Sequence, residues 1–278
     1  MDLLRLAAFS HNGKGGNPAA VVFYGEMPAA EEMLKIAAEV GYSESAFVVK
    51  QGDGWRVRYF APAREIPFCG HATIALGAVL GERFGEGSYR LFLNQSEISV
   101  RAETSTEGIL TATLQSPETF SEDVSSEYVD KILKAFGWKD NDLDPAFPVR
   151  FANGGVKHLI IFVKDHKTLV EMKYDFDLVK SLMNEKGLTT ISLLWRESDN
   201  VFHSRNPFAS GGIYEDPATG AAAAALAGYL RDIDWHGPAA FTILQGEDMG
   251  MPSRLLVKYT PAIGESVAVS GEVRYIRN

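Results

Sequence analysis

"EDPATGAAAAALAGYL", residues 215–230, resembles a second stretch of the same chain, "EIPFCGHATIALGAVL", residues 65–80. Aligned without a gap, the two are identical at seven of sixteen positions: Glu65/Glu215, Pro67/Pro217, Gly70/Gly220, Ala72/Ala222, Ala75/Ala225, Leu76/Leu226 and Leu80/Leu230. Alanine matches are expected in a chain this rich in alanine, but the Glu, Pro, Gly and Leu matches are not. Such self-similarity indicates a repeated structural unit.

The similarity continues upstream in the same order, with slightly smaller offsets. "YFAP" at 59–62 faces "PFAS" at 207–210, and "FSHNGKGGNPAAVVF" at 9–23 faces "FANGGVKHLIIFV" at 151–163. Between these matches, each half carries a helical hydrophobic pattern, a glycine that ends it and a β-rich run. Four matches in one order predict a duplicated domain.

We place the domain boundary in "QSPETFSEDVSSE" at 115–127, a polar stretch without hydrophobic periodicity. The predicted domains are residues 1–118 and residues 119–278. In each half, many short β-rich runs accompany few helices. The predicted fold class is therefore α+β, with two similar domains.

The two alanine-rich stretches are predicted to be buried helices at the centre of their domains. Residues 220–230 carry no charged side chain, whereas an exposed helix would alternate charged and apolar residues. A helix of alanine and glycine is slim enough for a curved, barrel-like sheet to wrap around it. Because alanine favours helix on its own, two ordinary structural helices are the alternative interpretation.

Each of these helices opens with a glycine, Gly70 or Gly220. The free N–H groups and partial positive charge of a helix N-terminus bind carboxylates, and glycine removes the Cβ that would obstruct a ligand. If the domains pack with pseudo-twofold symmetry, both N-termini face one cleft. We hypothesise that a substrate carboxylate is held between them.

Two candidate catalytic groups lie at these helix starts. His71 is in the first turn of one helix, and Asp216 comes just before the other. The helix dipole there favours a neutral imidazole and an ionised carboxylate. A plain turn or N-cap role is the alternative for Asp216.

Glu44 is the third candidate, in "YSESAFVV" early in a predicted strand. Its neighbours Ser43 and Ser45 are expected on the opposite face of the sheet. An acid on an apolar strand face is a candidate general base, because desolvation raises its pKa. The repeat places about Thr190 at the corresponding position, so only one half carries this carboxylate.

Composition excludes several function classes. The chain of 278 residues has a net charge of −9 and no cluster of Lys and Arg, which argues against nucleic-acid and membrane partners. It has no signal-peptide layout and no apolar run of membrane-spanning length, which predicts a cytoplasmic protein. The single cysteine, Cys69, excludes an internal disulfide, and the six histidines are scattered, so no metal site is expected.

In this order, "GNPAAVV", "SESAFV", "RYFAPAREIPFCGHATIALGAVL", "EDPATGAAAAALAGYL" and "QGEDMGMPSR" resemble the PhzF-like phenazine-biosynthesis isomerase family. The resemblance covers nearly the whole chain. It implies the diaminopimelate-epimerase fold, with two similar domains, each a β-barrel-like sheet around a central helix, and the active site between them. It also implies a homodimer, no cofactor, and a last strand, about 266–278, that returns to the first domain.

The resemblance also implies roles for particular residues. Glu44 matches the family's catalytic glutamate, which removes a proton from a carbon of a cyclic unsaturated amino acid and returns it elsewhere, shifting double bonds. His71 and Asp216 match the other two active-site positions. The positions that would contact the small carboxylate substrate are Asn17, Gly70, Ala72, Gly155, Gly220 and Ala221.

Three departures from the family pattern concern the substrate. Ala221 replaces the serine that commonly follows "DPATG", Met251 replaces the basic residue of "MGRPS", and Cys69 precedes the first helix glycine. These three departures predict that the substrate is a small carboxylate other than the phenazine precursor. The alternatives are a non-catalytic carboxylate-binding protein on the same fold, or an epimerase or racemase that does not use two thiols. A Cys69–His71 nucleophilic pair is a weaker interpretation.

Overall fold

The computed structural model describes residues 1–105 and 107–277, and the fold is α+β. The chain divides into two units. The first comprises Met1–Gln115 and the C-terminal segment from Val269, and the second comprises Ser116–Ala268. This division lies three residues before the predicted boundary at 118. Within the described residues, no helix is long and apolar enough to cross a membrane.

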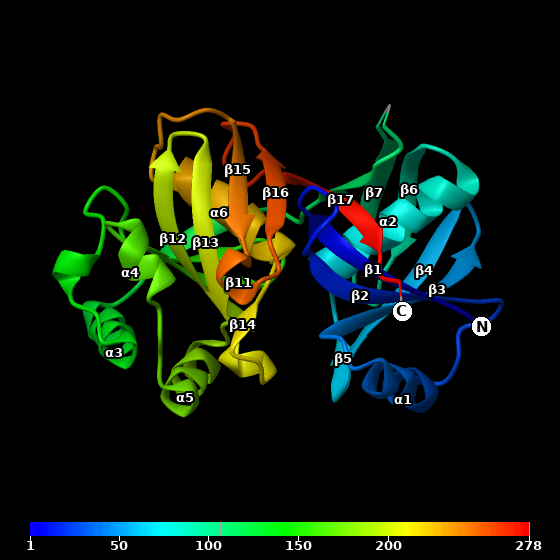
Figure 1. Cartoon of the computed structure of the whole chain (residues 1–278), viewed down its shortest axis with the longest axis horizontal. Helices are drawn as coiled ribbons and strands as arrows, with labels where there is room; N and C mark the ends of the chain where they lie inside the picture. The colour runs from blue at the N-terminus through cyan, green and yellow to red at the C-terminus, as the bar shows by residue number, and fades with distance from the viewer. Residues whose placement is uncertain (106, 278) are drawn as a thin grey trace. The chain divides into compact units, whose positions relative to one another are not determined.

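The first unit is a sheet that closes on itself around one helix (Figure 1). Its strands pair in the order β1-β2-β3-β4-β6-β7-β8-β17, and β17 pairs with β1 to complete the circuit. The elements are β1 (Asp2–Ser10), β2 (Asn17–Tyr24), α1 (Ala30–Val40), β3 (Glu44–Gln51), β4 (Gly54–Ala61), β5 (Arg64–Ile66), α2 (Gly70–Phe84), β6 (Gly87–Phe92), β7 (Glu97–Thr104), β8 (Leu110–Gln115) and β17 (Ala268–Tyr275).

Small residues on α2 allow the sheet to approach this central helix closely. Every residue from Gly70 to Leu80 is buried. A Cβ on Gly77 would lie 2.4 Å from Val100 Cγ2, and one on Gly81 would lie 2.5 Å from Ala102 Cβ. Both distances are too short for a real Cβ, so a larger residue here would push β7 off the helix.

The second unit repeats the strand order of the first. Its strands pair in the order β9-β10-β11-β12-β13-β15-β16, with β14 added beside β13. The elements are β9 (Phe120–Asp123), α3 (Ser126–Phe136), η1 (Asp140–Asp142), β10 (Arg150–Asn153), β11 (Lys157–Phe162), α4 (His166–Val170), α5 (Phe176–Lys186), β12 (Thr190–Ser198), β13 (Val201–Pro207), η2 (Ala209–Gly211), β14 (Glu215–Asp216), α6 (Gly220–Asp232), β15 (Ala240–Gln245), η3 (Glu247–Met249) and β16 (Ser253–Lys258).

The two units share the elements around their central helices, and the second adds α3 and α4. In each, a helix (α1 or α5) connects a parallel strand pair, β2 with β3 or β11 with β12. Parallel neighbours need such a crossover. In each, a short strand (β5 or β14) is followed by the alanine-rich helix, α2 or α6. The repeat in the sequence therefore corresponds to a repeat in strand order.

One detail of the sequence alignment is wrong by one residue. Phe60 pairs with Glu65 across β4 and β5, and Pro207 pairs with Glu215 across β13 and β14. Phe60, and not Tyr59, is therefore the counterpart of Pro207. The loop that follows is longer in the second unit, and an ungapped comparison of "YFAP" with "PFAS" cannot reveal where the extra residues lie.

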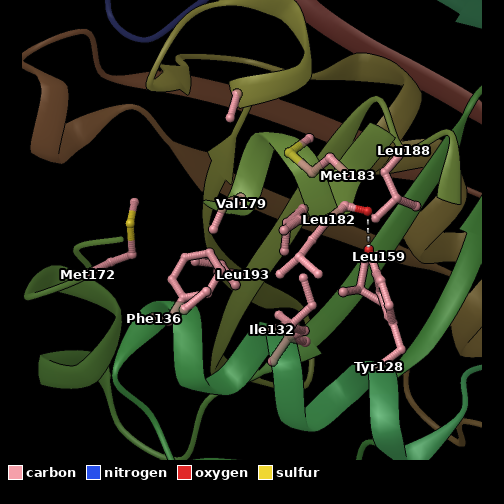
Figure 2. Close-up of a cluster of buried hydrophobic side chains, with 14 of the residues drawn as sticks. Tyr128, Ile132, Phe136, Leu159, Met172, Val179, Leu182, Met183, Leu188 and Leu193 are labelled. Atoms are coloured by element: carbon pink, nitrogen blue, oxygen red, sulfur yellow. Dashed lines mark hydrogen bonds between the residues drawn. The ribbon is translucent and has the colours of Figure 1, made fainter. Parts of the chain in front are cut away.

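The core of the second unit lies on both sides of its sheet. On one side, α6 is buried from Gly220 to Arg231, as the absence of charge in 220–230 predicted. A Cβ on Gly154 would lie 2.4 Å from the Ala221 carbonyl oxygen, so the turn after β10 lies directly on this helix. On the other side, α3 and α5 cover an apolar cluster that includes Ile132 and Leu193 (Figure 2).

Candidate active site

Three polar side chains, two of them from predicted site residues, meet at the start of the central helix of the first unit. Cys69 is the N-cap of α2, His71 is its second residue, and Glu44 is the first residue of β3. Their donor and acceptor atoms all lie within 4.8 Å of one another. The strand start and the helix start, far apart in sequence, therefore form one polar cluster inside the first unit.

His71 is held through both ring nitrogens. Its Nδ1 lies 3.2 Å from the amide nitrogen of Asn17 and 3.4 Å from Cys69 Sγ, and its Nε2 lies 3.4 Å from Glu44 Oε2. Because the Asn17 amide donates to Nδ1, the ring proton resides on Nε2, beside the Glu44 carboxylate. One ring nitrogen thus contacts Asn17 and Cys69, and the other lies beside Glu44.

Glu44 is a buried acid with hydrogen-bond support. Only 7% of the residue is exposed, and burial raises the pKa of its carboxyl above the ordinary value, while hydrogen bonds from Ser43 and Cys69 act in the opposite direction. A carboxyl whose pKa is raised is suited to accept a proton and give it back. The desolvation expected from the strand pattern is therefore present.

The expectation that Ser43 faces away from Glu44 is wrong. Ser43 Oγ lies 3.5 Å from His71 Nε2, and its hydroxyl also hydrogen-bonds to Glu44. The alternation of side chains holds within a strand, but β3 begins at Glu44, so Ser43 belongs to the preceding turn. The sequence cannot reveal this, because strand ends are its least certain feature.

The second unit contains its own polar cluster around Asp216. Asp216 lies in β14, opposite Asn206 of β13, and its Oδ2 accepts a 2.5 Å hydrogen bond from the Thr219 hydroxyl. Gln245, the last residue of β15, donates to the Asp216 carbonyl at 2.7 Å and accepts from the Thr219 backbone N–H at 3.2 Å. This glutamine fastens the "DPAT" turn to the sheet. Sequence reasoning missed its role, although "QGED" was part of the family resemblance.

The predicted carboxylate-binding positions lie at or near the starts of α2 and α6. Gly70 and Gly220 are the first residues of these helices, with Ala72 and Ala221 in their first turns. Neither helix has a side-chain hydrogen bond at its N-cap. The Thr219 hydroxyl is directed to Asp216 instead, so the first backbone N–H groups of α6 are not capped by it.

Gly155 lies in the turn between β10 and β11, where its exposed N–H donates to the Asn153 side chain at 2.9 Å. Its neighbour Gly154 is the residue that packs against the start of α6. The sequence match of "FANGG" with "FSHNG" located this turn, but it did not distinguish the two glycines. The candidate residues of the second unit are therefore Asp216, Gly220 and Ala221, with Gly154 and Gly155 in the adjacent turn.

The position that corresponds to Glu44 has different chemistry in the second unit. The first pair of the parallel ladder is Ala19 with Glu44 in one unit and His158 with Thr190 in the other. Thr190 is therefore the counterpart of Glu44, as the sequence repeat predicted. His158 Nδ1 lies 2.7 Å from Thr190 Oγ1, and burial lowers the pKa of His158 to about 3. A neutral hydrogen-bonded pair occupies this position.

The comparisons with known proteins identify the family and the fold. The sequence model of the phenazine biosynthesis-like protein family (PhzC-PhzF) matches residues 6–277. The chain belongs to this family. The uncharacterized isomerase YfhB of Bacillus subtilis is 27% identical over 99% of this chain and 98% of its own length.

Two further relatives define the reaction class and the fold. The trans-2,3-dihydro-3-hydroxyanthranilate isomerase of Pseudomonas chlororaphis is 28% identical over 90% of this chain and 87% of its own length. The crystal structure of a Bacillus anthracis phenazine biosynthesis protein of the PhzF family superposes with a TM-score of 0.86 at 23% identity, covering 100% of this chain and 98% of that one. The protein is therefore a PhzF-type enzyme of the isomerase class.

Proposed function

We propose that this PhzF-type enzyme is a cofactor-independent isomerase that moves a proton and a double bond within a small cyclic or amino carboxylate. Glu44 takes the proton from one carbon and returns it to another, and the substrate lies in a cleft between the two domains. The observation that carries this proposal is the Glu44 carboxyl itself. It is buried, its pKa is raised, and it lies 3.4 Å from His71 Nε2.

The chemistry needs no external reactant. The Glu44 carboxylate accepts a proton from a C–H bond, and the electron pair of that bond enters the conjugated system of the substrate. The protonated carboxyl exchanges its acidic proton with solvent and donates a proton to a second carbon, and the double bond takes its new place. A raised pKa assists this cycle, because both protonation states of Glu44 must be reached near neutral pH.

His71 and Asn17 orient Glu44 and the substrate. The Nε2 proton of His71 lies beside the carboxylate, so His71 stabilises the ionised form and shares the proton during transfer. Asn17 holds the ring from the other side and lines the site. Asp216, whose carboxylate accepts from Thr219, is the candidate to contact a polar or cationic group of the substrate.

The substrate carboxylate is bound by backbone N–H groups at the helix starts, around Gly70 and Ala72 in α2 and around Gly220 and Ala221 in α6. Both helices begin without a side-chain cap, and this supports the proposal, because an anion satisfies such groups. Gly155 is a weaker candidate for lining the same site.

The substrate is proposed to differ from that of the Pseudomonas chlororaphis relative, trans-2,3-dihydro-3-hydroxyanthranilate. Ala221 has no hydroxyl to hold a carboxylate, and Met251 supplies no positive charge. A different small carboxylate, which needs neither contact, suits this site better. We extend the proposal to a homodimer that works in the cytoplasm.

Deuterium exchange tests the proposal without knowledge of the physiological substrate. Cyclic dienyl and α-amino carboxylates, including trans-2,3-dihydro-3-hydroxyanthranilate, are incubated in heavy water with the wild type, Glu44→Gln or Glu65→Gln. Glutamine keeps the shape of the side chain but cannot accept the proton, so Glu44→Gln is expected to slow exchange by about 100-fold or more. Glu65→Gln is the matched control, because Glu65 pairs with Arg58 in the same unit.

Equal deuterium incorporation by the wild type and Glu44→Gln contradicts the assignment of Glu44 as the base. Tight binding of a carboxylate by the wild type, with no exchange at any carbon, favours a binding protein on this fold. If Glu44→Gln and Glu65→Gln both lose deuterium exchange, the first unit tolerates neither substitution. In that case the role of Glu44 has to be judged from the pH profile of the wild type.

A further inference from the structure

Glu44, Cys69 and His71 bring together a carboxylate oxygen, a thiol sulfur and an imidazole nitrogen. These atoms all lie within 4.8 Å of one another, and His71 Nε2 is 3.4 Å from Glu44 Oε2 and 3.9 Å from Cys69 Sγ. We propose that this cluster binds a thiophilic divalent metal ion of the zinc class. The expectation of no metal site rested on scattered histidines, whereas this cluster needs only one histidine.

The spacing of the three side chains fits a tetrahedral ion. Zinc binds sulfur at about 2.3 Å and nitrogen or oxygen at about 2.0 Å, so neighbouring ligand atoms lie roughly 3.3–3.6 Å apart. The distance from Nε2 to Oε2 already has this value. Sγ lies 3.9 Å from Nε2 and 3.4 Å from Nδ1, so the Cys69 side chain must turn toward Nε2 to complete the set of ligands. Three protein ligands leave the fourth position to water, as in zinc sites that are open to exchange.

The residues behind the three ligands also suit a metal. A ligating histidine is normally held through its other ring nitrogen, and Nδ1 of His71 lies 3.2 Å from the Asn17 amide. When Nε2 binds the ion, the ring proton moves to Nδ1, and a flip of the Asn17 amide presents Oδ1 as its acceptor. Ser43 hydrogen-bonds to Glu44 and restrains that carboxylate.

The charge balance favours a divalent ion of a particular kind. The Glu44 carboxylate and the Cys69 thiolate together neutralise a charge of +2, so a loaded site holds no net charge although all three residues are buried. A thiolate and an imidazole prefer Zn²⁺, Co²⁺ and Cd²⁺, whereas Mg²⁺ and Ca²⁺ prefer oxygen ligands. The site is therefore expected to discriminate between these two groups of ions.

The consequence for activity rests on the proposed function, but metal binding itself does not. A bound ion occupies the Glu44 lone pair and the His71 nitrogen that proton transfer requires. A zinc-class ion is therefore an inhibitor of the isomerase, and substrate turnover proceeds in the metal-free protein.

Titration of the metal-free full chain with Co²⁺ tests the proposal directly. Cys69 is the single cysteine, so an absorption band from charge transfer between thiolate and Co²⁺ reports on this residue alone. The wild type is expected to bind one equivalent of Co²⁺ and to show this band. Added Zn²⁺ should displace the bound Co²⁺, whereas added Mg²⁺ should not. Cys69→Ser is expected to lose the band and to bind Zn²⁺ at least about 100-fold more weakly. This loss of affinity is larger than the loss that follows mutation of a residue that only hydrogen-bonds to a ligand.

Two further variants keep the test decisive. His71→Gln weakens Zn²⁺ binding as well and covers the case that Cys69→Ser does not fold. His203→Gln is the control, because His203 lies 2.7 Å from Glu197 and 3.4 Å from Glu247 in a cluster without a thiol, and its removal should leave Zn²⁺ affinity unchanged.

Absence of the charge-transfer band in the wild type, or equal Zn²⁺ affinity of wild type and Cys69→Ser, overturns the metal site. If the wild type binds Zn²⁺ through Cys69 but shows no deuterium exchange without metal, the proposed function fails while the metal site stands. If exchange occurs and Zn²⁺ stops it at one equivalent, both proposals hold.

Discussion

The strand pairs β2–β3 and β11–β12 are built alike but carry different polar groups. In the first, Ala19 faces Glu44, and burial raises the pKa of the carboxyl. In the second, His158 faces Thr190, and burial lowers the pKa of the imidazole to about 3. Both groups are therefore shifted toward their neutral forms, by burial in each case.

The difference shows that a duplicated fold can bury different polar groups at the same place. At the start of the parallel pair β11–β12, the second unit buries the neutral, hydrogen-bonded side chains of His158 and Thr190. An ionisable proton-transfer group buried at this position would cost free energy of folding. The first unit keeps a desolvated acid, which is unfavourable for folding and which we propose to be the catalytic base. Perturbed acids concentrate at functional sites for this reason.

The largest expected effect concerns the arginine–glutamate pair that each unit carries at the same position. Arg205 and Glu215 form a bidentate pair whose side chains are 10% and 3% exposed, whereas Arg58 and Glu65 are 20% and 27% exposed. Arg205→Met leaves a buried carboxylate unpaired and is expected to destabilise the second unit by about 3–5 kcal/mol. Arg58→Met is expected to cost about 1 kcal/mol. Hydrogen exchange of amides in α6 and α2 measures both, and equal costs would contradict the comparison.

The second expected effect is the pH dependence of folding stability that His158 causes. Its folded pKa of about 3 lies below the unfolded value of 6.5, so the unfolded chain binds the extra proton first. Stability is therefore unaffected above pH 6.5 and falls as the pH is lowered toward 3, by about 2 kcal/mol at pH 5.

His158→Gln checks this assignment, because it removes the titrating group. The variant is expected to lose less stability than the wild type between pH 7 and pH 5, as measured by exchange of amides in β11 and α6. Parallel pH profiles for the two proteins would show that His158 is not the source.

The opposite sign is expected for Glu44. Its folded pKa is raised, so its contribution to stability is complete below the ordinary value of 4.5 and is lost as the pH rises through the folded pKa. Glu44→Gln cannot ionise, and the first unit is therefore expected to be more stable than in the wild type at pH 7, by about 1 kcal/mol.

Thermal unfolding at pH 4 and pH 7 measures this effect. The gain from Glu44→Gln should be present at pH 7 and small at pH 4, where the wild-type carboxyl is protonated as well. A variant less stable than the wild type at pH 7 would mean that the hydrogen bonds from Ser43 and Cys69 outweigh desolvation.

The smallest expected effect on deuterium exchange in candidate substrates concerns Thr190. Thr190→Val leaves His158 Nδ1 without its hydroxyl partner, at a cost of about 1–3 kcal/mol if the nitrogen stays unsatisfied and less if the ring rotates. Deuterium exchange in candidate substrates should be unchanged, in contrast to Glu44→Gln. Loss of exchange in Thr190→Val would show that the second unit contributes to proton transfer at this position.

The sequence by itself determined the duplication, the fold class and most of the candidate residues. Repeated Glu-x-Pro-x-x-Gly motifs and uncharged alanine-rich helices depend on residue identity and local spacing, which a sequence shows directly. For the same reason, Thr190 was recognisable as the counterpart of Glu44 before any distance was known.

Only the tertiary structure decided which side chains meet. Cys69 and Asn17 contact His71, Ser43 turns toward Glu44, and Gln245 fastens Asp216, although these residues lie on different strands or at strand ends. Such contacts depend on strand register and on the residue at which each strand or helix begins. A shift of one residue reverses the direction of every side chain, and local sequence does not specify these boundaries to that precision.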